Sequence, residues 1–156
     1  NRGTLYNSFG DKDTFFKSCV DQYNTVTDKH IAASLKNDEL VAWDAIAAYF
    51  TEAVINVPSK HRSMGCLLVN SVCESINYDK EIKKVVKGSL AIIRKALLVR
   101  LKDARKKGKI KKGISAELAA DVLMNSLHGI RVSSRDCKNA KQLQELIDFT
   151  LSSLKK

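Results

Sequence analysis

The chain has 156 residues, of which 44% are hydrophobic and 6% aromatic, with a single proline. This composition predicts one globular, mostly helical body with its own core and excludes a disordered chain. No apolar run reaches the roughly 18 residues that a membrane helix needs, so we expect no membrane partner. Lys and Arg number 27 against 17 Asp and Glu, a formal net charge of +10 that suits a polyanionic partner.

The first sixteen residues predict a short helix, a tight turn and the start of a longer helix. Leu5 and Phe9 are four residues apart and fall on one helical face. Gly10 ends the short helix, and Asp11 is a suitable N-cap for the next one. A helix of one or two turns is marginal alone, so Leu5 and Phe9 are expected to pack on another part of a protein.

The rest of the chain predicts a helical body. Apolar residues recur at spacings of three and four, and we expect Asn37 and Asp38, Asp79 and Ser115 to cap helices and Pro58 to end one. The expected helices cover residues 11–35, 38–57, 66–76, 79–107, 116–134 and 140–154. The predicted fold class is therefore all-α.

One stretch, residues 102–112, contains seven cations and a single acidic residue, Asp103. It falls at the end of an expected helix and in the loop that follows, where cations complement the helix C-terminus. We interpret it as a solvated helix end, because charge runs usually are.

The run from Arg2 to Phe16, RGTLYNSFGDKDTFF, resembles the signature of the TetR (tetracycline-repressor) family. The matching residues are Gly3, Thr4, Leu5, Tyr6, Phe9, Lys12, Asp13 and Phe16. In that family the stretch is the recognition helix of a helix-turn-helix and the start of the helix that links it to a ligand-binding body. The resemblance implies that residues 1–12 are the end of a DNA-binding domain whose two preceding helices are missing. It also implies that residues 13–156 form a ligand-binding and dimerisation domain.

The function that this resemblance implies is a one-component DNA-binding transcriptional regulator of the cytoplasm, expected to be a repressor. A small-molecule effector bound in the helical body would release it from a double-stranded DNA operator. The resemblance assigns base or phosphate contacts to Arg2, Thr4 and Asn7, and phosphate-backbone contacts to Tyr6 and Lys12. The basic run at 102–112 would lie at the end of the body remote from DNA.

A pocket for an apolar ligand is predicted from aromatic, soft and polar residues on the inward sides of separate helices. These residues are Tyr23, Trp43, Phe50, Cys66, Asn70, Met124 and His128. Each could instead be an ordinary core residue. Asn70 and His128 are the stronger candidates, because a polar group on an apolar face needs a partner, which a ligand or a neighbouring backbone group supplies.

The last two expected helices carry more apolar surface than one partner face requires. The residues concerned are Leu118, Val122, Leu127, Ile130, Leu143, Leu146, Ile147 and Leu151. They either close the core of one chain or bury against a second copy as a four-helix bundle. The periodicity leaves these two readings open, and the family resemblance favours the homodimer.

The four cysteines, Cys19, Cys66, Cys73 and Cys137, are scattered and lack metal-ligand spacing, which favours a reducing compartment. Cys66 follows Gly65 at an expected helix start, where the helix dipole favours a thiolate. Some members of the family sense electrophiles or oxidants through a cysteine in a similar segment. A thiol-based repressor acting through Cys66 is therefore one alternative, against an inert core cysteine.

No nucleophile–base motif, phosphate-binding loop or zinc signature is present in the sequence. We therefore expect no enzymatic activity, no cofactor and no metal. A helical ligand-binding or enzyme domain unrelated to DNA is the remaining alternative.

Overall fold

The computed structural model describes residues 10–74, 78–136 and 139–156, and within these ranges the chain is all-α, as predicted. The helices are α2 (Lys12–Ala33), α3 (Ala42–Phe50), the π-helix η1 (Thr51–Ile55), α4 (Ser59–Arg62), α5 (Leu67–Cys73), α6 (Lys80–Lys106), α7 (Ala116–Ser133) and α8 (Ala140–Leu154). In the described ranges, extended pairing is limited to one isolated bridge, between Ile110 and Lys155.

Three of the predicted helix starts are confirmed by side-chain caps. The Asp11 carboxylate accepts a hydrogen bond from the Thr14 amide at 2.7 Å, and Asp79 accepts one from the Ile82 amide at 2.7 Å. The Ser115 hydroxyl accepts a bond from the Leu118 amide at 3.0 Å. Each cap satisfies an amide that has no partner inside its own helix.

The prediction that Asn37 and Asp38 cap the second helix is wrong. That helix begins at Ala42, and its N-cap, Val41, makes no side-chain capping bond. The turns before it are held from outside by Arg100 of α6, whose Nε donates to the Leu35 carbonyl and whose Nη2 donates to the Asn37 carbonyl, both at 2.6 Å. These bonds come from a guanidinium 65 residues away and satisfy backbone carbonyls, whereas a capping side chain would have accepted bonds from backbone amides.

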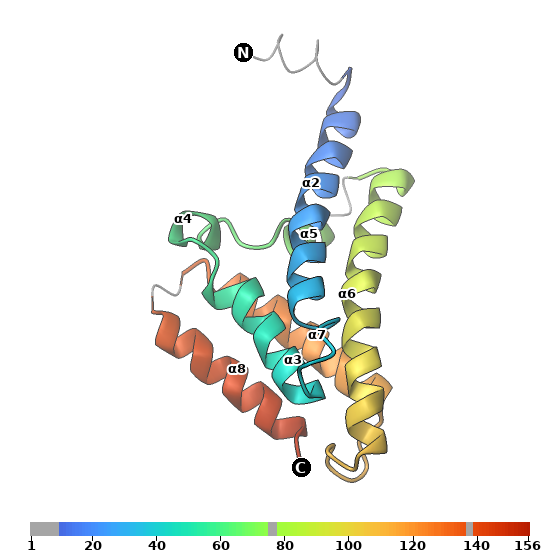
Figure 1. Ribbon diagram of the computed structural model, residues 1–156. Coiled ribbons are helices and arrows are strands. Elements are labelled where there is room, and N and C mark those ends of the chain that lie inside the picture. Colours follow the sequence, from blue (N-terminus) through green and yellow to red (C-terminus); the bar gives the residue numbers. More distant parts are fainter. Residues whose placement is uncertain (1–9, 75–77, 137–138) are drawn as a thin grey trace.

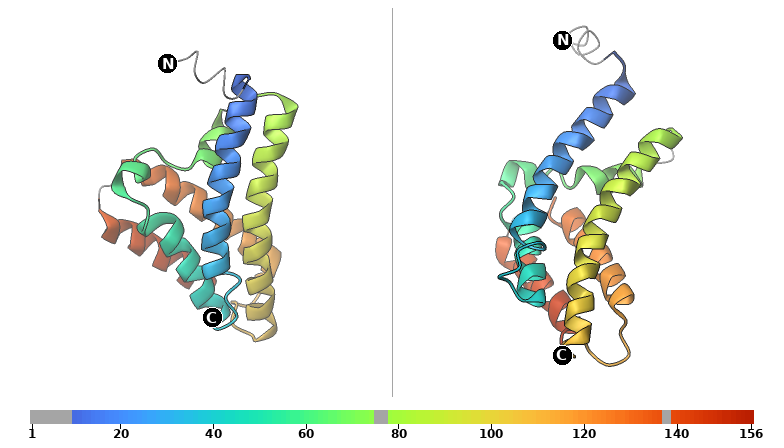
Figure 2. Two further views of the ribbon diagram at one scale, coloured as in Figure 1. Left: turned by 45° about the horizontal axis from the view of Figure 1, so that its top comes forward. Right: turned by 45° about the vertical axis from the view of Figure 1, so that its right-hand side comes forward.

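The helices are arranged around α6. In Figure 1, α2 and α6 run side by side and begin at the same end of the molecule, and the left-hand view of Figure 2 shows the same pairing. α6 also packs on α3, α5 and α7, while α8 packs on α7 and α3. One apolar cluster fills the centre, with Phe50, Leu97, Leu101 and Leu123 fully buried.

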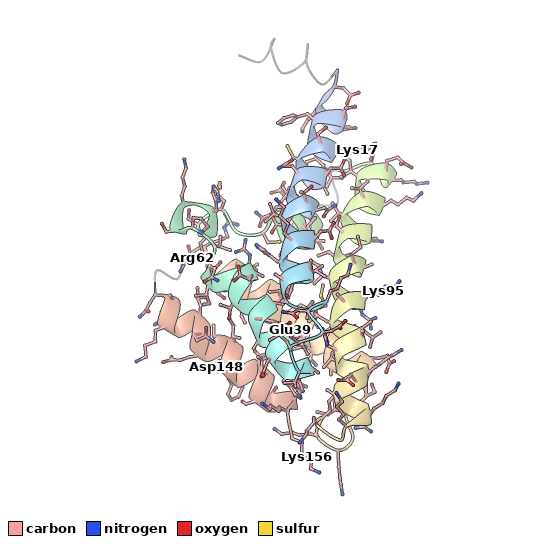
Figure 3. All side chains as sticks on the ribbon, in the orientation of Figure 1. Lys17, Glu39, Arg62, Lys95, Asp148 and Lys156 are labelled. Carbon is pink, nitrogen blue, oxygen red and sulfur yellow. The ribbon has the colours of Figure 1, made fainter. Side chains whose placement is uncertain are left out.

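The basic run lies at the opposite end from the start of α2. It forms the last turn of α6 and the loop to α7, near the C-terminus of the chain (Figure 1). In this loop the Lys109 carbonyl accepts bonds from the Trp43 indole Nε1 at 3.0 Å and from the Lys156 amide at 3.1 Å. Figure 3 labels Lys156 at this end and Lys17 on the far part of α2. The prediction of a helix end and loop is confirmed.

In the described part of the chain, no helix combines the length and the apolar character that crossing a bilayer requires.

Candidate functional site

A cavity of about 610 Å³ lies between α2, η1, the α4–α5 segment, α6 and α7. This volume is within the range of small-molecule sites in proteins. α2 contributes a wall of four residues in successive turns, Tyr23, Val26, Thr27 and His30. The long helix that begins beside the opening segment is therefore also one side of the cavity.

The rest of the wall combines apolar and polar side chains. Leu90 and Ile93 of α6, Val69 of α5 and Leu127 of α7 supply aliphatic surface, which favours apolar ligand atoms. Hydrogen-bonding groups come from α3, η1, α5 and α7, and these residues are Tyr49, Glu52, Asn70, His128 and Arg131. The cavity can hold a molecule that is mostly apolar and has a polar end.

Tyr23 connects α2 to the start of α5. Its hydroxyl donates a hydrogen bond to the Cys66 sulfur at 3.1 Å, across 43 residues of sequence. Burial raises the pKa of Tyr23, and the adjacent Cys66 thiol raises it further, while Arg131 acts in the opposite direction. The phenol therefore stays neutral and keeps its proton for this bond.

Arg131 is a buried cation in the wall of the cavity, with a residue exposure of 6%. Its Nη2 donates to the Gly65 carbonyl at 2.7 Å, whereas its Nη1 is buried and has no hydrogen-bond partner among the described residues. Its charge opposes the burial-raised pKa values of both Tyr23 and Tyr49. The guanidinium thus lies close to the two phenols, at the polar end of the cavity.

His128 lies one helical turn before Arg131 on α7, so both side chains are on one face. The imidazole is half-buried, and burial lowers its pKa. Its Nε2 is buried and has no partner in the described part of the chain. A neutral histidine can donate or accept at that nitrogen, depending on its tautomer.

The segment before α5 is fixed by its own hydrogen bonds. Gly65 has a positive φ of 78°, and the Asn70 amide Nδ2 donates to the Met64 carbonyl at 3.0 Å. Asn70 was predicted to bond either to a ligand or to a backbone group, and in the structure its partner is a backbone carbonyl. This segment positions both Cys66 and the carbonyl that orients Arg131.

Four of the seven predicted pocket residues line this cavity: Tyr23, Cys66, Asn70 and His128. The other three, Trp43, Phe50 and Met124, lie in the close-packed core and are absent from the cavity wall. Trp43 is in the first turn of α3, where its indole bonds to the α6–α7 loop. Phe50 has no exposed surface, and Met124 is 7% exposed.

Sequence reasoning missed Tyr49, Glu52 and Arg131 as cavity residues. The positions Ala120, Met124, Leu127 and Arg131 follow the spacing four, three, four, so the sequence does place Arg131 on the buried stripe of α7. A cation on an apolar stripe was the available signal. The π-helical turn that carries Glu52 gave no comparable signal, although such turns often occur at functional sites.

The predicted DNA-contact residues can be only partly placed. Lys12 is the first residue of α2 and is exposed. Arg2, Thr4, Tyr6 and Asn7 lie outside the described residues. Their contacts with DNA stay predictions.

The predicted dimer residues divide into two groups. Leu127, Ile130, Leu143 and Ile147 are buried within the single chain. Leu118 and Leu146 are exposed, while Val122 and Leu151 are half-buried. Phe149 of α8, which sequence reasoning did not single out, is 75% exposed. The homodimer stays a prediction, and only the exposed and half-buried residues of the predicted set are available to contact a second copy.

The fold and the cavity define an all-α domain, in which the long helix α2 borders a ligand-sized cavity. No family model matches the chain. The chain is 26% identical over 150 residues to the HTH-type transcriptional repressor ComR of Escherichia coli (strain K12), an alignment that covers 95% of this chain and 70% of ComR.

Two solved structures share the fold. The regulatory protein TetR from Rhodobacter sphaeroides superimposes with a TM-score of 0.85 at 14% identity, over 99% of this chain and 82% of that chain. A TetR transcriptional regulator from Chloroflexus aurantiacus J-10-FL gives a TM-score of 0.76 at 14% identity, over 97% and 78%. The chain has the fold of these TetR regulators, which is the fold that the resemblance of its opening residues implied.

Proposed function

We propose that this chain is the body of a one-component transcriptional repressor whose DNA binding is controlled by a small molecule held in the cavity. The observation that carries the proposal is that α2 forms one wall of the cavity and begins at Lys12, at the end of the segment predicted to contact DNA. The similarity to ComR, a transcriptional repressor by name, supports a regulator rather than an enzyme.

The mechanism follows from the position of Tyr23, Val26, Thr27 and His30 along α2. A ligand that pushes on these side chains changes the angle of α2 against α6 and α7. Because Lys12 begins the same helix, the DNA-contacting end moves with it. A ligand shifts this equilibrium only by its difference in affinity for the two arrangements, so it must fit the released arrangement better.

DNA binding requires two copies in this proposal. A two-fold dimer presents two reading heads to two half-sites, and a change in the angle of each α2 changes the distance between the heads. The exposed apolar side chains Leu118, Leu146 and Phe149 of α7 and α8 support this pairing. Exposed apolar side chains on two helices that pack together favour an interaction surface.

A second candidate function is thiol sensing by Cys66. It is favoured by the position of the sulfur in the cavity wall and by the hydrogen bond from Tyr23. An electrophile entering the cavity would modify the thiol and break that bond. The candidate fails if thiol labelling of the native protein leaves Cys66 unmodified, or if Cys66→Ser responds normally to the inducer.

The DNA part of the proposal is tested with the full-length gene product and its operator. Replacing the exposed Lys12 by Ala should weaken binding to all sequences alike and lower the salt slope by about one. A change in sequence preference without a change in salt dependence would show that Lys12 does not hold the phosphate backbone. Native mass spectrometry of the same sample reports whether a small molecule copurifies, and catalytic turnover of that molecule would contradict the regulator.

A further inference from the structure

Among the described residues, the buried Arg131 has no counter-charge, because none of the ion pairs there includes it. Arg94 and Arg100 of α6, by contrast, each lie within 4 Å of an aspartate carboxylate. A charged group taken out of water without a counter-ion is costly. Arg131 Nη2 donates to the Gly65 carbonyl, and the Arg131 side chain also interacts with the Tyr23 hydroxyl, but its Nη1 is buried without a partner at 6% residue exposure.

The one carboxylate among the described cavity-lining residues does not fill this role. Glu52 accepts a hydrogen bond from Asn56 Nδ2 at 2.6 Å and forms no ion pair. Both residues belong to the η1 end of the cavity wall. The cavity therefore contains an acid and a guanidinium that are not bonded to each other.

A second buried nitrogen without a partner lies on the same helix. His128 Nε2 is buried without a partner, and His128 and Arg131 share one face of α7. Two nitrogens without partners in one cavity wall favour a ligand that has acceptor oxygens. Leu90, Ile93 and Leu127 supply aliphatic surface in the same cavity, which favours an apolar remainder of that ligand.

We propose that the effector is an apolar molecule with one anionic group, such as a carboxylate, that binds Arg131 Nη1 and His128 Nε2. Arginine suits this role because its planar donors match a carboxylate, and the apolar walls strengthen the contact by excluding water. This inference rests on the proposed function and names the class of ligand for the same cavity.

The test compares two fluorescent probes that differ in one charged group. 8-Anilinonaphthalene-1-sulfonate carries a sulfonate on its rings, and N-phenyl-1-naphthylamine has the same rings without it. The anionic probe should bind the protein at least about tenfold more tightly, as a charge-assisted hydrogen bond in a buried site would give. Octanoate should displace it, and 1-octanol should do so more weakly.

Three variants locate the effect. Arg131→Met should bring the two probes to similar affinity without changing the neutral probe, and Glu52→Gln should strengthen binding of the anionic probe. Arg94→Met is the matched control, because it removes the same charge from an exposed ion pair with Asp121 outside the cavity wall. If Arg131→Met fails to fold, His128→Gln tests the same end of the cavity.

The outcomes separate this inference from the proposed function. Equal affinity for both probes, or an equal loss in Arg94→Met and Arg131→Met, overturns the anionic class while the cavity remains a ligand site. Binding of neither probe overturns both. Preference for the anion that disappears only in Arg131→Met or His128→Gln supports the assignment.

Discussion

The hydroxyl of Tyr23 on α2 donates a hydrogen bond to the sulfur of Cys66, 3.1 Å away at the start of α5. This bond joins α2, which follows the segment predicted to contact DNA, to the loop that orients Arg131 through the Gly65 carbonyl. A molecule in the cavity can therefore contact both Tyr23 at one end of this series of hydrogen bonds and Arg131 at the other. The position of α2 and the polar end of the cavity are not independent of each other.

Removing the hydrogen bond between Tyr23 and Cys66 should weaken the contact between α2 and the start of α5 without leaving a cavity in the core. Tyr23→Phe keeps the ring and is expected to lower the free energy of unfolding by about 1 kcal/mol or less, because a neutral hydrogen bond is worth about that much. Chemical denaturation measures the loss. Tyr78→Phe is the matched control, since the Tyr78 hydroxyl bonds to the exposed Glu74, and it should change stability less. Equal losses in the two variants would mean that the Tyr23 hydroxyl adds nothing by its position.

A side chain at Gly65 is expected to destabilise the fold. Its φ is +78°, and an added Cβ would lie 3.1 Å from Arg135 Cδ and 3.3 Å from Asn70 Oδ1. Gly65→Ala should cost about 1 to 2 kcal/mol of unfolding free energy, the typical penalty of left-handed backbone for an L-residue. It should also weaken binding of the anionic probe, because the carbonyl that orients Arg131 shifts.

Gly88→Ala is the control for that change. Gly88 lies in the exposed middle of α6, and an added Cβ meets nothing within 4 Å. Alanine should raise stability there by about 0.5 to 1 kcal/mol, because glycine is unfavourable inside a helix. A Gly65→Ala protein as stable as Gly88→Ala would contradict the backbone conformation described at residue 65.

Stability should fall as the solution becomes acidic, in part through His128. Burial lowers the pKa of this imidazole below its ordinary value of 6.5, so the unfolded chain takes up the proton more readily than the folded one. Its contribution is therefore complete above pH 6.5 and is lost as the pH falls below that value. His128→Gln should flatten this part of the stability profile, measured by denaturation at a series of pH values. An unchanged slope would show that His128 is protonated equally easily in both states.

Phe149 should matter for assembly and not for folding. It is 75% exposed on α8, so Phe149→Glu removes little packing within one chain. If the α7 and α8 faces pair in the dimer, the charge should convert dimers to monomers in sedimentation velocity. Val99→Glu on α6, at an equally apolar position that is 61% exposed, should leave the dimer intact. A monomeric wild-type protein would contradict the proposed interface.

Much of the fold was predictable because its signals are local. Asp11, Asp79 and Ser115 cap helices within three residues of themselves, and the last helix has the expected bounds, Ala140–Leu154. The start of α3 was not predictable in this way. Its preceding turns are held by Arg100, which is 65 residues from Leu35, and nothing near Asn37 in the sequence indicates that long-range bond.

The cavity was only half predictable, since periodicity identifies buried faces and does not tell a cavity wall from close packing. Trp43, Phe50 and Met124 are as buried as expected and contact only core or loop. Arg131 was overlooked because a cation in the last turn of a helix is usually a surface residue that complements the dipole. Its partner, the Gly65 carbonyl, is 66 residues away and becomes visible only in the folded chain.

We propose that a ligand in the cavity lowers the affinity for operator DNA by moving α2. The direct measurement is the operator affinity of the full-length gene product, by fluorescence anisotropy, with the cavity empty and with it saturated by a small molecule confirmed by native mass spectrometry. We expect saturation to weaken operator binding about tenfold or more, within the usual range of allosteric coupling. An operator affinity that is the same with the cavity full and empty would contradict it.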